Sequence, residues 1–291
     1  MTQSKIIFKI KGYENFTVRE GWLQKGIRAV QSDPFVFAEH AGADALGVGI
    51  NMAKSIRYWL KAFQLTTELP RKGMMLTDFG NLLFQKDPYM ELPATLWLLH
   101  SMLVRNRELA TSWYLFFNCM QANQMEQEEA EEALLYEMGR YTQGQVFSSK
   151  TVKDDCSAIL HMYVGGKERE YGSKDEERSP FVDLGLMELE GKRIACNAPS
   201  VEILPVLAVY DVLLRQAEGT NHLLLDQAME GINSPGKLFF MNRVMLYDYL
   251  LTMQNRQLLT INRTAGLDMI YFPTVVTKKM EQIFLQMIYD R

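Results

Sequence analysis

The chain has 291 residues, of which 47% are hydrophobic and 23% are charged, and its net charge is −4 at neutral pH. This composition predicts a globular protein, and at about 150 residues per domain its length predicts two domains or three small ones. The negative charge excludes a globally basic coat for nucleic acid, so any such contact must come from a local basic face.

The expected compartment is the cytoplasm. The first residues lack the pattern of a signal peptide, and no stretch approaches the about 18 uncharged apolar residues of a membrane helix, so no membrane contact is expected. Cys119, Cys156 and Cys196 are far apart in the sequence and odd in number. They show neither a disulfide framework nor metal-site spacing, which favours a reducing environment.

The chain opens with a predicted strand over residues 5–10, followed by a predicted helix that begins near Val18. Thr17 can cap this helix, and Glu20 stands three residues further on, as in a capping box. Apolar residues recur along the segment, so the simplest interpretation is a capped helix with one buried side.

Residues 1–87 show the element order of a winged helix-turn-helix domain. A short helix is expected over 35–46 and a longer one over 50–63, with a glycine turn between them. Two predicted strands follow, joined by a tight turn between Pro70 and Gly73. This order predicts a winged domain.

The longer helix carries cations on one face, because 3.6 residues make one turn. A helix fits the major groove, its cations meet phosphates, and a hairpin tip reaches the adjacent backbone or minor groove. We therefore expect this domain to bind double-stranded DNA, although one cationic helix face alone is more often only solvated surface. The expected DNA contacts are Asn51, Lys54, Arg57, Tyr58, Lys61, Arg71 and Lys72.

Two further domains are predicted, a central helical one over residues 88–198 and a C-terminal one over 199–291. The central domain ends in a charged loop over 165–180 and a hairpin, which suggests a second winged unit. The C-terminal domain repeats the order helix, turn, helix, hairpin, and closes with a helix over 277–289. The predicted fold class is mainly α, with tandem winged helix-turn-helix-like units and short β-hairpins.

A polar cluster near the N-terminus is the candidate catalytic site: Glu14, Arg19, Glu20, Lys25 and Arg28. Phosphodiester cleavage needs a carboxylate for a metal ion and cations that face the charge developing on the phosphate. Glu20, together with Glu14, is the candidate ligand for Mg²⁺ or Mn²⁺, and Arg19 and Lys25 are the candidate cations. The alternative is that Glu20 caps the helix and the cations are surface residues. The sequence shows no phosphate loop, nucleophile elbow or zinc spacing, so no organic cofactor is expected.

Several segments resemble signature blocks of a bacterial family associated with DNA phosphorothioation, long described as of unknown function. The best-described type is SspB, a DNA-nicking component of a single-strand phosphorothioation and phage-defence system. The resemblance runs over essentially the whole chain and is strongest over residues 12–118. The segments are GYENFTVREGWLQKG, LGVGINMAKSIRYWLKAF, LTDFGNLLF, DPYMELPATLWLLH and ATSWYLFFN.

The resemblance implies a protein that nicks one DNA strand so that companion proteins can place sulfur in the backbone. The implied companions are a cysteine desulfurase, a sulfotransfer enzyme and an ATPase. The implied functional residues lie in the REGWL block, at Arg19, Glu20 and Trp22, with Lys25 beside them. Relatives often carry His at the position of Tyr13, and its absence here removes one candidate base or metal ligand.

Three interpretations therefore stay open. The first is a metal-dependent DNA nickase, and the second is a non-enzymatic winged-helix regulator or adaptor of the same machinery. The third is a protein–protein scaffold, since many winged helices bind proteins through their recognition helix. A homodimer is compatible with all three.

Overall fold

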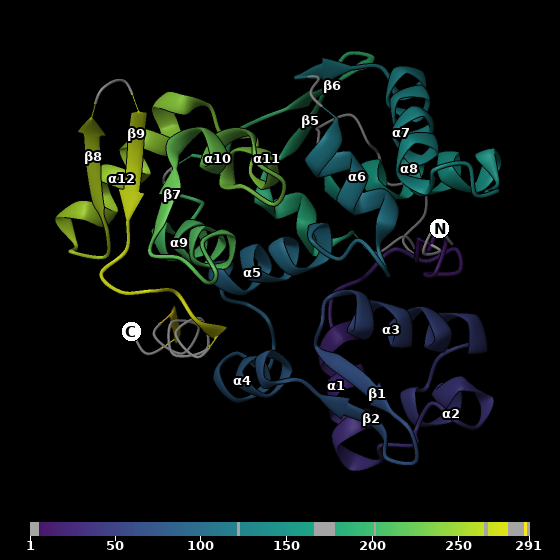
Figure 1. Ribbon diagram of the computed structural model, residues 1–291. Coiled ribbons are helices and arrows are strands. Elements are labelled where there is room, and N and C mark those ends of the chain that lie inside the picture. The colour runs from purple at the N-terminus through teal and green to yellow at the C-terminus, as the bar shows by residue number, and fades with distance from the viewer. Residues whose placement is uncertain are drawn as a thin grey trace, which may run out of the picture.

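The computed structural model describes residues 6–120, 123–165, 178–200, 202–264, 267–278 and 288–289. Helices dominate, and the strands form small sheets built around β-hairpins. The predicted mainly α fold with short hairpins is confirmed. The tandem winged units stay a prediction. In Figure 1 the first elements form a separate lower lobe, α4 lies beside it, and the later elements form the larger upper mass.

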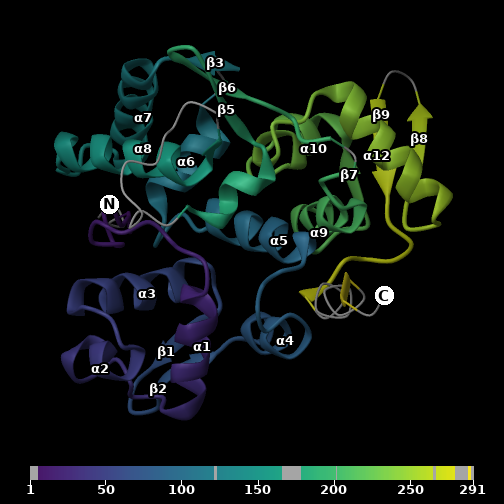
Figure 2. The same cartoon turned by 180° about the vertical axis from the view of Figure 1, so that it is seen from behind.

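The lower lobe contains the elements from α1 to β2. Gly26 lets helices α1 and α3 pack closely, since a Cβ at this position would lie only 2.8 Å from side-chain atoms of Ile56 and Leu60. In Figure 2, α1 runs beside α3 and the hairpin, and α4 lies at its other side. The elements are α1 (Trp22–Ser32), η1 (His40–Gly42), α2 (Ala43–Leu46), α3 (Ile50–Ala62), β1 (Thr66–Leu69) and β2 (Gly73–Leu76), followed by α4 (Asp78–Lys86).

The predicted elements before residue 47 need correction. Residues 6–10 form no strand, because the Lys9 and Lys11 amides donate hydrogen bonds to side chains elsewhere in the chain rather than to a neighbouring strand. The first helix begins at Trp22 rather than near Val18. The expected helix over 35–46 is instead a series of turns followed by η1 and α2.

The central part of the chain consists of helices and one small sheet. The helices are α5 (Pro93–Val104), α6 (Thr111–Cys119), α7 (Gln127–Thr142) and α8 (Ser149–Tyr163). The sheet has the order β3-β6-β5-β4 and consists of β3 (Gln124–Met125), β4 (Val164–Gly165), β5 (Met187–Glu190) and β6 (Arg193–Cys196), with η2 (Pro180–Leu184) before β5. The predicted hairpin is therefore present as β5–β6, whereas most of the charged loop before it lies outside the described residues.

The C-terminal elements form a third group. They are α9 (Val206–Gln216), β7 (His222–Leu224), α10 (Leu225–Glu230), α11 (Pro235–Leu238), α12 (Arg243–Asn255), β8 (Thr260–Thr264) and β9 (Leu267–Tyr271). The predicted hairpin is present as β8–β9, and β7 adds a strand on its other side. Most of the expected closing helix, residues 279–287, lies outside the described residues. Among the helices that the structure describes, none is long and apolar enough to cross a membrane.

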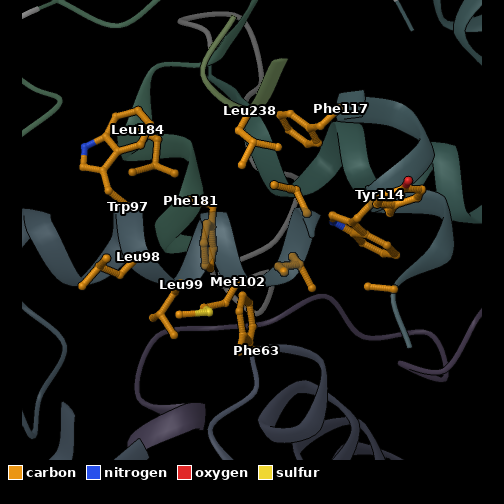
Figure 3. Packing of buried hydrophobic residues seen from close by; sticks show 14 of the residues in the cluster. Phe63, Trp97, Leu98, Leu99, Met102, Tyr114, Phe117, Phe181, Leu184 and Leu238 are labelled. Carbon is orange, nitrogen blue, oxygen red and sulfur yellow. The ribbon is translucent and has the colours of Figure 1, made fainter. Parts of the chain in front are cut away.

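The lobes share one continuous hydrophobic core. Phe63, just after α3, stacks on Phe181 of η2 with ring centroids 5.3 Å apart and an interplanar angle of 7°. Figure 3 shows Phe63 below Leu99 and Met102 of α5, on the side of the lower lobe. The lower lobe is therefore fixed to the rest of the molecule by buried aromatic contacts.

Candidate functional site

The N-terminal end of α1 opens on a hollow of about 720 Å³. Arg19, Glu20 and Lys25, all predicted from the sequence as catalytic residues, line it, and Arg28 lines it one turn further along the helix. The hollow runs along α1 as far as Asp33. The structure thus gathers most of the predicted polar cluster at one place.

The N-terminus of α1 faces this hollow without a capping side chain. Its N-cap is Gly21, which has φ 74° and offers no side chain, and the first turn holds no acidic residue. The alternative in which Glu20 caps this helix is therefore wrong. Since helix N-termini carry partial positive charge and attract phosphate groups, the positive end of α1 adds to the cations Arg19 and Lys25. Together they favour an anionic group in the hollow.

Aromatic rings hold two of the cations in place. The Arg19 guanidinium lies 5.8 Å from the ring centroid of Phe16 and 5.4 Å from that of Trp22. The Arg28 guanidinium lies 5.6 Å from the ring centroid of Tyr89, which follows α4. Cation–π contacts of this kind restrict the motion of the side chains. Tyr89 was not predicted, because its role depends on a contact between distant segments.

The carboxylates of the hollow fit a magnesium ion only in part. Glu20 precedes α1 and Asp33 follows it, so about 16 Å of helix separates them at 1.5 Å per residue, too far to share one ion. No group of three or more His, Cys, Asp or Glu side chains that could hold a metal occurs among the described residues. Mg²⁺ is commonly bound by one or two carboxylates together with substrate phosphates and water. Glu20 fits that kind of shared site and does not fit a site made of protein ligands alone.

Glu14 does not join this site. It is absent from the lining of the hollow, and its backbone has φ 55° in the turn before α1. Its charge acts on Lys9 instead: burial lowers the pKa of Lys9, Lys61 and Arg57 lower it further, and Glu14 opposes the shift. The expectation that Glu14 and Glu20 hold one ion together is therefore not supported by their positions.

The basic face of α3 is only partly free. Asn51 and Lys54 are exposed, whereas Arg57 and Lys61 form ion pairs of 2.6 and 3.1 Å with Glu68 of β1. Hydrogen bonds from Lys61 and Arg57 lower the pKa of Glu68. The face therefore carries less net positive charge than its sequence suggests.

The hairpin tip is basic and exposed, as predicted. Arg71 and Lys72 both lie at the surface, and Arg71 adopts φ 62° in the turn. Lys9 is a further surface cation beside Arg57 and Lys61 that the sequence analysis missed, since it was assigned to a strand.

Tyr58 was predicted as a DNA contact, and this expectation needs correction. Its side chain is only 6% exposed, and its hydroxyl donates a 2.9 Å hydrogen bond to the carbonyl of Leu109. Burial raises its pKa well above the usual value. The reason is that the segment before α6 covers this side of α3, a contact that helical periodicity within α3 does not reveal.

Tyr13 lies in the core rather than in the hollow beside Glu20. Its ring stacks on Trp59 at 5.8 Å, and its hydroxyl donates to the carbonyl of Asp154 at 3.3 Å. The neighbouring carboxylate of Asp155 is buried and accepts hydrogen bonds from the Lys11 amide at 3.1 Å and from the Ser112 hydroxyl at 2.5 Å. Burial raises the pKa of Asp155 to about 6. This network ties the N-terminal segment to α6 and α8.

The chain is similar to two solved structures and matches one protein family. The chain resembles a solved structure of magnesium-ion-bound SspB with a TM-score of 0.86 and 26% identity, over 97% of this chain and 88% of that chain. A second SspB crystal structure gives a TM-score of 0.85 at the same identity and coverage. No curated protein matches the chain. The model of the family DUF4007, proteins of unknown function, matches residues 10–289, and the chain therefore belongs to that family.

Proposed function

We propose that this protein binds double-stranded DNA and nicks one strand in a magnesium-dependent reaction at the hollow beside α1. The observation that carries the proposal is the gathering of Arg19, Glu20 and Lys25 around the uncapped N-terminus of α1. The similarity to magnesium-bound SspB over nearly the whole chain supports it.

The hollow suits a backbone phosphate. The positive end of α1, Arg19 and Lys25 would bind the phosphate and stabilise the charge that develops on it during cleavage. Glu20 would hold the magnesium ion jointly with phosphate oxygens, and the ion would supply further charge stabilisation and a nucleophilic water. Because the aromatic contacts of Arg19 limit its motion, its guanidinium is positioned before the substrate arrives.

The duplex would be oriented by surfaces outside the hollow. Asn51 and Lys54 on α3, and Arg71 and Lys72 at the hairpin tip, are exposed for phosphate contacts. In this proposal the nick serves a phosphorothioation-linked defence system in the bacterial cytoplasm, with a cysteine desulfurase, a sulfotransfer enzyme and an ATPase as companions.

A plasmid assay tests the reaction. Supercoiled plasmid incubated with the full chain and Mg²⁺ or Mn²⁺ should yield open-circular product, which EDTA abolishes. Glu20→Gln should lower the nicking rate by at least about 100-fold, the scale of lost metal or transition-state contacts. Glu128→Gln, which changes an exposed glutamate on α7, is the matched control and should leave the rate unchanged. Equal rates in the wild type and Glu20→Gln would contradict the proposed role of the hollow.

A second candidate function is a non-enzymatic DNA-binding regulator or adaptor. The observation in its favour is that Glu20 is the one carboxylate lining the N-terminal end of the hollow among the described residues. It predicts salt-sensitive DNA binding without open-circular product at any metal concentration. A chain that shifts no DNA at all would instead point to a protein–protein scaffold.

A further inference from the structure

The β1–β2 hairpin has an exposed apolar face. Thr67 pairs with Met75 and Leu69 pairs with Gly73, so these four residues share one face of the hairpin. Leu69 is 39% exposed and Met75 is 42% exposed. Large apolar side chains are thus displayed on a hairpin whose backbone is fixed by regular pairing.

Phe35 extends this face from outside the hairpin. The Met74 amide donates a 2.8 Å hydrogen bond to the carbonyl of Pro34, which attaches this segment to β2. A Cβ at Gly73 would lie 3.2 Å from the Phe35 ring, yet 52% of Phe35 is exposed. We call Phe35, Leu69 and Met75 the apolar wing face.

The opposite face of the hairpin is turned to α3. Glu68 pairs with Met74 on that face and binds Arg57 and Lys61 of α3. These contacts show that this face of the hairpin lies against α3, so the apolar wing face is directed away from the helix. The β1–β2 hairpin therefore has one face that lies against α3 and one apolar face that is exposed to solvent.

Two cations lie beside the apolar wing face. Of the two neighbouring carboxylates, one accepts a backbone hydrogen bond and the other lies on the opposite face. Arg71 and Lys72 are exposed in the turn between the two strands. The Asp33 carboxylate accepts a 2.8 Å hydrogen bond from the Phe35 amide, and Glu68 is on the other face. A DNA duplex has anionic phosphates outside and stacked bases with apolar faces inside. Apolar side chains flanked by cations complement both. Proteins that bend DNA insert such wedges between base pairs from the minor groove.

We propose that the apolar wing face inserts between base pairs of the bound duplex from the minor groove, while Arg71 and Lys72 bind the flanking phosphates. The inserted side chains partly unstack one base step and kink the DNA. Ser32, Asp33 and Val36 line the far end of the hollow along α1, so the segment that carries Phe35 also forms part of the hollow's wall. The distorted step then lies beside the far end of the hollow, about the length of α1 away from Glu20. This inference rests on the proposed function for its ligand, DNA.

The test uses the full chain and short duplexes with 2-aminopurine at successive positions. Fluorescence anisotropy of an end label reports binding, 2-aminopurine emission reports unstacking, and energy transfer between the duplex ends reports bending. The wild type should raise the emission several-fold at one or two adjacent positions and shorten the end-to-end distance. The double variant Phe35→Ser, Met75→Ser should lose both signals while losing no more than about tenfold in affinity, because the phosphate contacts are intact.

Two control variants separate the wedge from general effects. Val244→Ser changes an apolar residue on α12 that is 73% exposed, and it should behave as the wild type. Arg71→Gln with Lys72→Gln should weaken binding and reduce the salt slope by up to about two, since each phosphate contact contributes about one.

The outcomes distinguish the two proposals. No binding by anisotropy would overturn the proposed function and this inference together. Binding without unstacking or bending, or equal signals in the double variant and the wild type, would overturn this inference alone. A change of oligomeric state in the double variant, measured by sedimentation, would assign the face to a second copy of the chain and would also overturn it.

Discussion

Asp155 is a buried carboxylate whose partners come from distant parts of the chain. It accepts hydrogen bonds from the Lys11 amide and the Ser112 hydroxyl, and burial raises its pKa to about 6 from the ordinary 3.8. The folded chain therefore favours the protonated form more than the unfolded chain does. Its contribution to stability must depend on pH.

This contribution falls as pH rises. Below pH about 4 the group is protonated in both states and its stabilising effect is complete. Between pH about 4 and 6 the unfolded chain releases the proton first, which favours unfolding. Above pH about 6 the loss should reach about 3 kcal/mol, at 1.36 kcal/mol per pKa unit. Urea unfolding of the wild type and of Asp155→Asn at pH 4 and 7 measures it; a difference between the two proteins that stays constant with pH would contradict the shift.

Single residues also explain which site predictions failed. Composition and spacing predicted the grouping of Arg19, Glu20 and Lys25, which line one hollow, because these side chains lie close together in the sequence. Tyr58 was misplaced because its burial depends on the segment around Leu109, far along the chain. A sequence pattern reports what neighbours on one element share, and it cannot report what another element covers.

At the scale of elements, Glu68 of the β1–β2 hairpin pairs with cations of α3. This exposed carboxylate binds two cations that would otherwise be free for phosphate, Arg57 and Lys61. Surface ion pairs contribute only about 0–1 kcal/mol to stability, so their main effect here is on charge. In the proposed function, Glu68 would therefore limit the affinity of α3 for DNA.

Removing this charge should strengthen DNA binding. Glu68→Gln frees Arg57 and Lys61, so affinity at low salt should rise and the salt slope should steepen by up to about two. Fluorescence anisotropy across a salt series measures both quantities, with Glu128→Gln as the surface control. Unchanged or weaker binding in Glu68→Gln would show that α3 does not contact phosphates.

The elements also differ in how well the sequence predicts them. Regular apolar spacing predicted α3 closely, and turn residues predicted the β1–β2 and β8–β9 hairpins. The sequence predicted a capping side chain at Thr17 and a helix from Val18. The N-cap is instead Gly21, with φ 74°, so the helix begins four residues later, at Trp22. Backbone conformation at one residue decided the boundary, and no periodicity reports it.

For the whole molecule, the lower lobe and the remainder are joined by a shared hydrophobic core and not only by the connecting chain. Phe63 is fully buried and stacks on Phe181, more than 100 residues away in the sequence. The predicted boundary near residue 87 therefore separates units that are joined by packing. We expect them to unfold together.

Removal of the Phe63 ring tests this coupling. Phe63→Ala leaves a cavity between the lobes and should lower the free energy of unfolding by about 3–5 kcal/mol. Thermal unfolding followed by calorimetry should show one transition in the wild type and a lower midpoint in the variant. Phe35→Ala, which truncates an exposed ring, should have a much smaller effect. Two separate transitions in the wild type would instead show that the lobes fold independently.

Among the residues that the structure describes, Glu20 is the lone carboxylate at the N-terminal end of the hollow, and in the proposed reaction this bears on the order in which metal and DNA bind. A magnesium ion held by one protein carboxylate, with water and DNA phosphates as its other ligands, would bind tightly only when protein and duplex meet. By thermodynamic reciprocity, DNA then raises metal affinity by the same factor as metal raises DNA affinity. The protein without DNA would then hold no tightly bound metal, and nicking activity would arise only in the complex of protein, metal and DNA.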